Sequence, residues 1–236
     1  VDEPQEIPID TIFENDDLIV LNKRAGLTVH PGAGQKDNTL INGLIFKYPE
    51  LNSIERYGLV HRLDKDTSGL MLIARNQKSH TLITNMIQNR AIYRGYKALV
   101  HGVPISGATI EKPIGRHPTN RLIFCVREGG RNSITHFKVL KKFKNFSMLD
   151  ISLETGRTHQ IRVHMKHKGF PIVGDKAYCN ITQWKDSNDD EMQAVNSLKR
   201  QALHAYKLGF NLNEEKFSFK CELPSDIQNC LDHIQS

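Results

Sequence analysis

The sequence has little that points to a membrane, a metal or a bound cofactor. No apolar run approaches the roughly 18 residues that a membrane-spanning helix needs, and no secretory signal is visible. The four cysteines lie far apart without a CxxC pair, and neither a P-loop nor an HExxH pattern occurs. We therefore expect no membrane span, no metal and no cofactor, and the cysteine usage fits the reducing cytoplasm best.

Composition is that of a folded protein with a moderate excess of positive charge. The 236 residues are 39% apolar, which is enough to bury a full core. No internal repeat, low-complexity tract or clear linker is present, so we expect one continuous α+β domain over residues 1–236. Thirty-two Lys and Arg against 26 Asp and Glu give a net charge of +6, which favours a polyanionic partner, with nucleic acid the first candidate.

Apolar spacing and turn residues predict the order of helices and strands. A hairpin is expected near the N-terminus. Thr158 is expected to cap a helix that ends at Gly169, and Ser225 is expected to cap the last helix. The polar segment Asn180–Asn196 is expected to be a surface loop. The remaining predictions are helices over 39–48 and 77–92 and strands over 18–21, 70–74, 93–100, 134–143, 146–154, 201–210 and 217–221.

The stretch GLVHRLDKDTSGLMLIARN, from Gly58 to Asn76, holds a polar centre between two apolar, strand-like ends. A loop fixed at both ends presents reactive groups while losing little entropy, and Asp64 at its centre is the candidate reactive residue. The plain alternative is a solvated turn in which Asp64 forms ion pairs with Arg62 and Lys65.

The segment ETGRTHQIRVHMKHKG, from Glu154 to Gly169, is the densest group of basic and hydrogen-bonding residues. Its helical spacing places Ile161 and Met165 on a core face and leaves Arg162 to reach across a site. An ionised aspartate can act as a nucleophile or a base, and a buried arginine would keep it charged. On the strand 93–100, alternation turns Tyr96 inward, where a tyrosine of the core is the plain alternative.

Several strings resemble the RluA family of pseudouridine synthases. VHRLDKDTSGLMLIA resembles the signature segment of the family, and GRTHQIRVH, from Gly156 to His164, resembles its third motif. YRGYKALV and RQALHA are similar to its tyrosine and late leucine-containing motifs, and VHPGAG is similar to the RluD branch. The match runs from about Thr11 to the C-terminus.

The resemblance implies a mainly antiparallel mixed β-sheet with flanking helices and a central catalytic cleft. It implies an enzyme that isomerises uridine to pseudouridine in ribosomal RNA of the large subunit, at the uridine cluster of the subunit-interface stem-loop, without metal or cofactor. It implies a monomer, and a full-length protein with an N-terminal S4-like RNA-binding domain that is absent from this chain. Asp64 would be the catalytic aspartate, Tyr96 would lie against the target base, and Arg162 would pair with Asp64. The implied substrate-binding residues are His61, Arg62, Arg157, Thr158, His159, Gln160 and Leu203.

Three alternatives stay open at this level. The chain could be a synthase of the same family with another ribosomal or transfer RNA target, or a non-catalytic RNA-binding protein on the same scaffold. It could also be an unrelated hydrolase, which would need a second carboxylate, and Asp66 is the near candidate. Whether Asp64 attacks the uracil ring or the sugar carbon is not decided by the residues.

Overall fold

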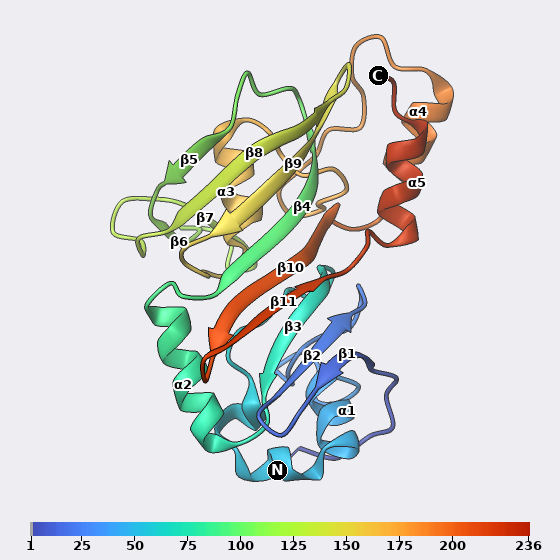
Figure 1. The fold of residues 1–236 in the computed structure, drawn as a ribbon. Coiled ribbons are helices and arrows are strands. Elements are labelled where there is room, and N and C mark those ends of the chain that lie inside the picture. The colour runs from blue at the N-terminus through green and yellow to red at the C-terminus, as the bar shows by residue number, and fades with distance from the viewer. Residues whose placement is uncertain (1) are drawn as a thin grey trace. The chain divides into compact units, whose positions relative to one another are not determined.

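The computed structural model describes residues 2–236, and its contacts divide the chain into two compact units. The first comprises Val1–Tyr93 and Lys207–Cys221, and the second comprises Arg94–Tyr206 and Glu222–Ser236. The element order is mixed α and β, and the neighbouring strands described below pair antiparallel (Figure 1). The expected α+β fold with a mainly antiparallel sheet and flanking helices is confirmed.

The strands of the first unit begin with the predicted hairpin, β1 (Asp10–Glu14) and β2 (Leu18–Lys23). β2 pairs with β3 (Ser68–Ala74), whose seven residues are all buried, and the order continues to β10 (Leu203–Leu212). β11 (Glu215–Lys220) pairs with the Lys207–Leu212 part of β10. The strand expected before the central loop is reduced to one bridge, between Leu59 and Ile73.

Two helices and two short 3-10 turns complete the first unit. α1 (Leu40–Lys47) begins after Thr39, whose hydroxyl accepts from the Asn42 N–H while the Asn42 side chain accepts from the Thr39 N–H. Turns η1 (Pro49–Ser53) and η2 (Glu55–Gly58) lead to the central loop, and α2 (Gln77–Gln88) follows β3. The predicted positions of both helices are confirmed, although α2 ends four residues earlier than expected.

The core of this unit forms where α2 packs on the sheet. Alternate residues of β2, β3 and β10 meet Ile83 of α2 and Phe217 of β11. Side chains alternate between the two faces of a strand, and in β2 and β3 the residues of the other face are buried as well. Core packing on both faces therefore holds the strands next to the central loop.

The second unit contains the sheet order β10-β4-β9-β8-β5 and a separate two-stranded ribbon. β8 and β9 form the expected pair, with a bulge between Val139 and Lys141. α3 (Gln160–Lys168) packs against β8 (Figure 1). The strands are β4 (Tyr93–His101), β5 (Ala108–Glu111), β6 (Ile114–Arg116), β7 (Phe124–Val126), β8 (Ile134–Lys142) and β9 (Phe146–Leu153).

Three expectations about helix boundaries in this unit were wrong. α3 (Gln160–Lys168) has His159 at its N-cap in a left-handed conformation (φ 57°), so Thr158 is not the cap. α5 (Ser225–His233) has Pro224 at its N-cap, which makes Ser225 the first helical residue. The segment expected to be a surface loop contains a helix, α4 (Asp189–Ser197). Within residues 2–236 no helix combines the length and apolar character needed to cross a membrane.

Candidate active site

The candidate residues divide between the two units. His61, Arg62 and Asp64 lie in the first unit, in the loop that connects Leu59 to β3. The others lie in the second unit, on β4, on the segment that enters α3, on α3 itself and at the start of β10; they are Tyr96, Arg157, Thr158, His159, Gln160, Arg162 and Leu203.

The loop that carries Asp64 is held by a buried lysine. Lys23 is 1% exposed, and its Nζ donates to the carbonyl oxygens of Arg24 at 2.8 Å, Leu27 at 3.0 Å and Lys65 at 2.9 Å. Gly26 also donates its N–H to the Lys65 carbonyl, at 2.9 Å. Because the ammonium group joins the end of β2 to the residue after Asp64, the half-buried carboxylate of Asp64 is carried on a rigid backbone.

The imidazole of His61 connects the same loop to β3. The backbone N–H of Leu72, on β3, donates to His61 Nε2 at 2.9 Å. Since Nε2 accepts this bond, the ring is neutral and carries its proton on Nδ1. One ring nitrogen of this predicted substrate-binding residue is therefore committed to the fold.

Arg62 is exposed and is oriented by His30. Its Nη1 donates to His30 Nε2 at 2.8 Å, and His30 Nδ1 donates to the Pro31 carbonyl oxygen at 3.1 Å. These two bonds are compatible with one neutral tautomer, in which the proton is on Nδ1. The VHPGAG loop thus contributes a residue that positions Arg62.

Tyr96 occupies the middle of β4 opposite Ile151 of β9 and is 6% exposed. The expectation that its side chain turns inward is confirmed. It shares one side of the strand with Arg94 and Ala98, because side chains two positions apart point the same way.

Arg162 is held by an aspartate that the sequence analysis did not single out. Its Nε donates to Asp175 Oδ2 at 2.8 Å and its Nη2 donates to Asp175 Oδ1 at 2.9 Å, a two-pronged ion pair in which the carboxylate is fully buried. The guanidinium carbon also lies 5.0 Å from the centre of the Tyr178 ring. Both partners come from the turn after α3, so the guanidinium plane is fixed in direction.

His159 belongs to the same network through Tyr178. The Tyr178 hydroxyl accepts from the backbone N–H of Phe124 at 2.9 Å and lies 2.6 Å from His159 Nδ1. The His159 ring meets the rings of Phe124 and Tyr178 edge to face. The left-handed residue that starts α3 is therefore anchored to the β6–β7 ribbon.

Gln160 acts as a brace for the loop before α3. Its Oε1 accepts from the Thr155 hydroxyl at 2.8 Å and from the Arg157 N–H at 3.0 Å. Its Nε2 donates to the Ile134 carbonyl at 3.0 Å and to the Thr135 hydroxyl at 2.9 Å. At 3% exposure the amide has both donors in use, so its main contribution is to hold the loop.

The remaining predicted substrate-binding residues are Arg157, Thr158 and Leu203. Arg157 is half-buried and its Nε donates to the Asn132 carbonyl at 3.0 Å. Thr158 is half-buried, and Leu203 is 3% exposed at the first position of β10.

Other reactive groups are poorly placed for chemistry. Burial raises the pKa of both the Cys221 and the Cys230 thiol to about 11, so these thiols stay protonated and are weak nucleophiles. Within residues 2–236 no group of three or more His, Cys, Asp or Glu side chains is arranged to hold a metal ion.

Asp175 and Tyr178 are the site residues that sequence reasoning missed. Both occur in the string GDKAY, which follows the Gly and Pro that end α3. Asp175 could have been predicted because a buried arginine needs a carboxylate to balance its charge. Asp175 is the first acidic residue after the helix.

Comparison with known proteins gives the family. The sequence pattern described as RNA pseudouridylate synthase matches residues 17–167, which is more than half of the chain. The chain therefore belongs to the RNA pseudouridylate synthase family, and the family expected from its motifs is confirmed. It is a pseudouridine synthase, an isomerase of RNA uridine.

Several relatives align with nearly the whole chain. Ribosomal large subunit pseudouridine synthase D of Xanthomonas campestris pv. campestris is 43% identical over 98% of this chain and 71% of that protein. The protein of the same name from Buchnera aphidicola subsp. Acyrthosiphon pisum is 44% identical over 98% of this chain and 75% of that protein.

Solved structures show the same fold. Human RNA pseudouridylate synthase domain containing 1 superimposes with a TM-score of 0.70 at 25% identity, covering 94% of this chain and 86% of that one. Human RNA pseudouridylate synthase domain containing 4 gives a TM-score of 0.74 at 21% identity, covering 95% and 92%, and supports the fold alone.

Proposed function

We propose that this enzyme acts on ribosomal RNA of the large subunit, with Asp64 as the nucleophile. The support for the target is that the aligned relatives named above are pseudouridine synthases of the large ribosomal subunit. The support for Asp64 is its place at the centre of the signature segment, on a loop that Lys23 fixes through three carbonyl oxygens. That anchoring is the observation that carries the assignment, since a nucleophile needs a defined position.

The proposed reaction is an isomerisation in which Asp64 forms a transient bond with the nucleoside. The carboxylate attacks either the uracil ring or the C1′ carbon of the sugar, and the bond between N1 and C1′ breaks. The uracil then turns within the pocket, and its C5 carbon bonds to C1′. For attack at C1′, C5 displaces the Asp64 oxygen as it bonds to C1′; for attack on the ring, Asp64 leaves when the C5–C6 double bond re-forms. The C5 proton is lost and N1 takes up a proton, so substrate and product contain the same atoms.

Tyr96, Arg162 and Arg62 have separate proposed roles. Tyr96 lies against the target base and is the candidate to accept the C5 proton. Arg162 is the proposed partner of the Asp64 carboxylate, and its two-pronged bond with Asp175 supports this because it fixes the guanidinium. Arg62, oriented by His30, takes the place of the extruded base or contacts phosphate.

RNA binding is proposed to use the basic segments 116–131 and 157–168. Extruding a base costs a few kcal/mol of stacking, least in a loop or single strand, and phosphate contacts offset this cost. His61, Arg157, Thr158, His159, Gln160 and Leu203 complete the proposed substrate site, directly or by holding the loops that form it. The uridine cluster of the subunit-interface stem-loop is the proposed target, for a monomer that acts in the cytoplasm through a catalytic domain formed by residues 1–236.

Tritium release tests the assignment of Asp64. Large-subunit ribosomal RNA carrying tritium at C5 of uridine is incubated with wild type and with Asp64→Asn, without added metal. Wild type should release tritium, whereas Asp64→Asn should release none while still binding the RNA, because the amide is a poor nucleophile. A near-normal rate from Asp64→Asn would remove Asp64 from this role.

Asp66→Asn is the matched control, because it makes the same change in the same loop. It should retain turnover, whereas a hydrolase that needs two carboxylates would lose activity with either substitution. Cleaved RNA instead of released tritium would favour that hydrolase, and bound but unchanged RNA would favour a non-catalytic binding protein.

A further inference from the structure

Three arginines of the second unit are more than nine-tenths buried, and they differ in how their charge is balanced. Arg94 is 7% exposed, Arg162 is 8% and Arg200 is 7%. Arg162 is neutralised by Asp175, and Arg200 donates from Nε and Nη2 to the two oxygens of Asp226 at 2.7 Å and 3.0 Å. Arg94 forms no ion pair with any carboxylate of residues 2–236, and its buried Nε has no hydrogen-bond partner there.

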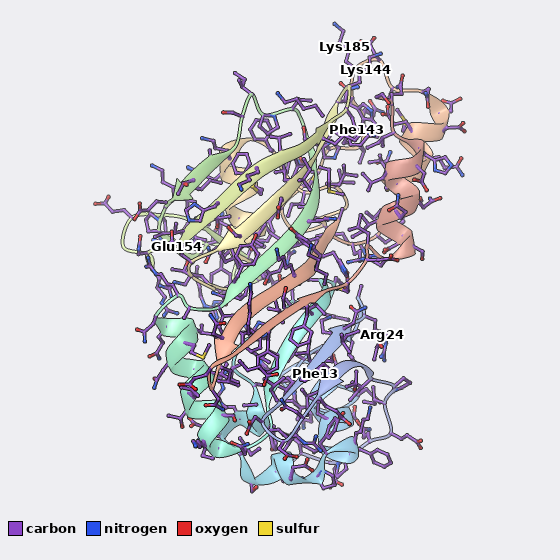
Figure 2. The ribbon with its side chains drawn as sticks, viewed as in Figure 1. Phe13, Arg24, Phe143, Lys144, Glu154 and Lys185 are labelled. Carbon is purple, nitrogen blue, oxygen red and sulfur yellow. The ribbon has the colours of Figure 1, made fainter. Side chains whose placement is uncertain are left out.

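The guanidinium of Arg94 lies directly under the loop that enters α3. A Cβ atom added to Gly156 would lie 2.8 Å from Arg94 Nη1, 3.8 Å from Cζ and 3.9 Å from Nη2. Gly156 is exposed, so this end of the guanidinium lies beside exposed backbone that carries no side chain. The loop begins at Glu154, labelled in Figure 2, whose Oε2 is paired with His136 Nε2 at 2.7 Å.

The loop above Arg94 is rigid and carries one acidic and one basic side chain, Glu154 and Arg157. Gln160 and Thr155 brace it from inside through buried hydrogen bonds, and Arg157 adds a second guanidinium. Arg94 also shares one side of β4 with Tyr96, two positions away, which places it about 7 Å from Tyr96 along the strand. Successive phosphates of an RNA strand are separated by a comparable distance.

We propose that Arg94 and the Gly156 loop form a binding site for one phosphodiester group of the RNA, next to the nucleotide that Tyr96 contacts. This rests on the proposed function, because it needs RNA at the Tyr96 face of β4. An unbalanced buried cation is unfavourable in the free protein, and an RNA phosphate supplies the counter-charge that aspartates supply to Arg162 and Arg200. Glycine at 156 is required because a side chain there would cover the guanidinium.

The experiment compares Arg94→Met with Lys144→Met. Lys144 is an exposed residue at the end of the β8–β9 hairpin (Figure 2), so the control removes one positive charge from the same unit and leaves the same side chain. Tritium release gives KM and kcat, and RNA binding is measured at a series of salt concentrations. Arg94→Met should raise KM about tenfold with kcat little changed, because a charge-assisted hydrogen bond to phosphate is lost.

The salt dependence gives an independent reading of the same contact. For Arg94→Met the slope of log affinity against log salt should become shallower by about 0.7, the value for one phosphate contact on a single strand. Lys144→Met should keep the wild-type KM and slope. Arg94→Lys, which keeps the charge, should recover part of the affinity, and Gly156→Ala should raise KM without removing a charge.

Thermal unfolding without RNA separates binding from a structural role. Arg94→Met should melt at or above the wild-type temperature, because it removes an unbalanced buried charge. A lower melting temperature, a fall in kcat at constant KM, or a salt slope equal to that of Lys144→Met would each overturn the proposal. If wild type binds RNA but releases no tritium, the proposed reaction fails while the salt slopes still decide the role of Arg94.

Discussion

Acid should destabilise the second unit through His101, the last residue of β4. The imidazole is 6% exposed, and its centre lies 5.0 Å from the Phe146 ring and 5.8 Å from the Trp184 ring. Burial in this apolar setting lowers the pKa of His101 from 6.5 to about 4. The folded protein therefore keeps this ring neutral at pH values at which the unfolded chain binds a proton.

The loss of stability follows from the difference between the His101 pKa in the unfolded chain, 6.5, and in the folded protein, about 4. Above pH 6.5 neither state binds the proton, so the full stability is present. Below it, each pH unit lowers the free energy of unfolding by about 1.4 kcal/mol, until the folded ring also titrates near pH 4. His101 alone should thus remove about 3 kcal/mol between pH 6.5 and 4, a large part of the stability of an ordinary domain.

His164 should add to the loss in the same direction. Burial lowers its pKa, and the hydrogen bond from its Nε2 to the Lys112 carbonyl opposes part of that shift. Its Nδ1 accepts from the Thr135 hydroxyl, so protonation would remove that bond. Activity lost below pH 6.5 will therefore include unfolding as well as any change in the chemistry.

Urea unfolding followed by tryptophan fluorescence tests the effect of His101. Trp184 is the one tryptophan in the sequence, and its ring contacts His101, so its emission reports this region. Wild type and His101→Phe are unfolded at steps from pH 8 to pH 5, below which global charge repulsion grows. The variant should lose about 1.4 kcal/mol less per pH unit below 6.5; an identical acid slope in both proteins would refute the reasoning.

Two further substitutions test the supports of the candidate site. Asp175→Asn should lower the free energy of unfolding by about 3–5 kcal/mol and reduce turnover, because it leaves the Arg162 charge buried without its carboxylate; an unchanged urea midpoint would show that this pair is not needed. His30→Ala should leave stability within about 0.5 kcal/mol of wild type, because the Arg62 contact is exposed, but should raise KM for RNA. An unchanged KM in steady-state kinetics would mean that His30 does not orient Arg62.

Local chemistry explains which elements could be predicted from the sequence. Thr39 followed by Asn42 gives the start of α1, and Pro49 gives its end, because caps and breakers act over three or four residues. The strand pair β8 and β9 could be predicted from the alternation of apolar and polar residues, which is also a local pattern. The errors at Thr158 and Ser225 were of one residue each, because the caps are His159 and Pro224.

Partners that are distant in the sequence explain what was missed. α4 begins at a strong signal, Asn188 before three acidic residues, but the polar composition outweighed it. What makes the segment a helix in the fold is Glu191, a buried carboxylate that accepts from Trp184 Nε1 and from the N–H and Nε2 of Gln235, all at 3.0 Å. No pattern along the chain pairs residue 191 with residue 235.

Two residues of the same motif, Gln160 and Arg162, differ in the hydrogen bonds that they form within the fold. In GRTHQIRVH, Gln160 and Arg162 are two positions apart, yet Gln160 uses both amide N–H groups and its oxygen within the fold. The guanidinium of Arg162 has five N–H groups, and Asp175 accepts from two of them. Asp175 therefore fixes the orientation of the guanidinium, which is what the proposed role of Arg162 requires. Under the proposed function, a mutation of Gln160 should act by loosening the loop, and a mutation of Arg162 should act on the Asp64 carboxylate.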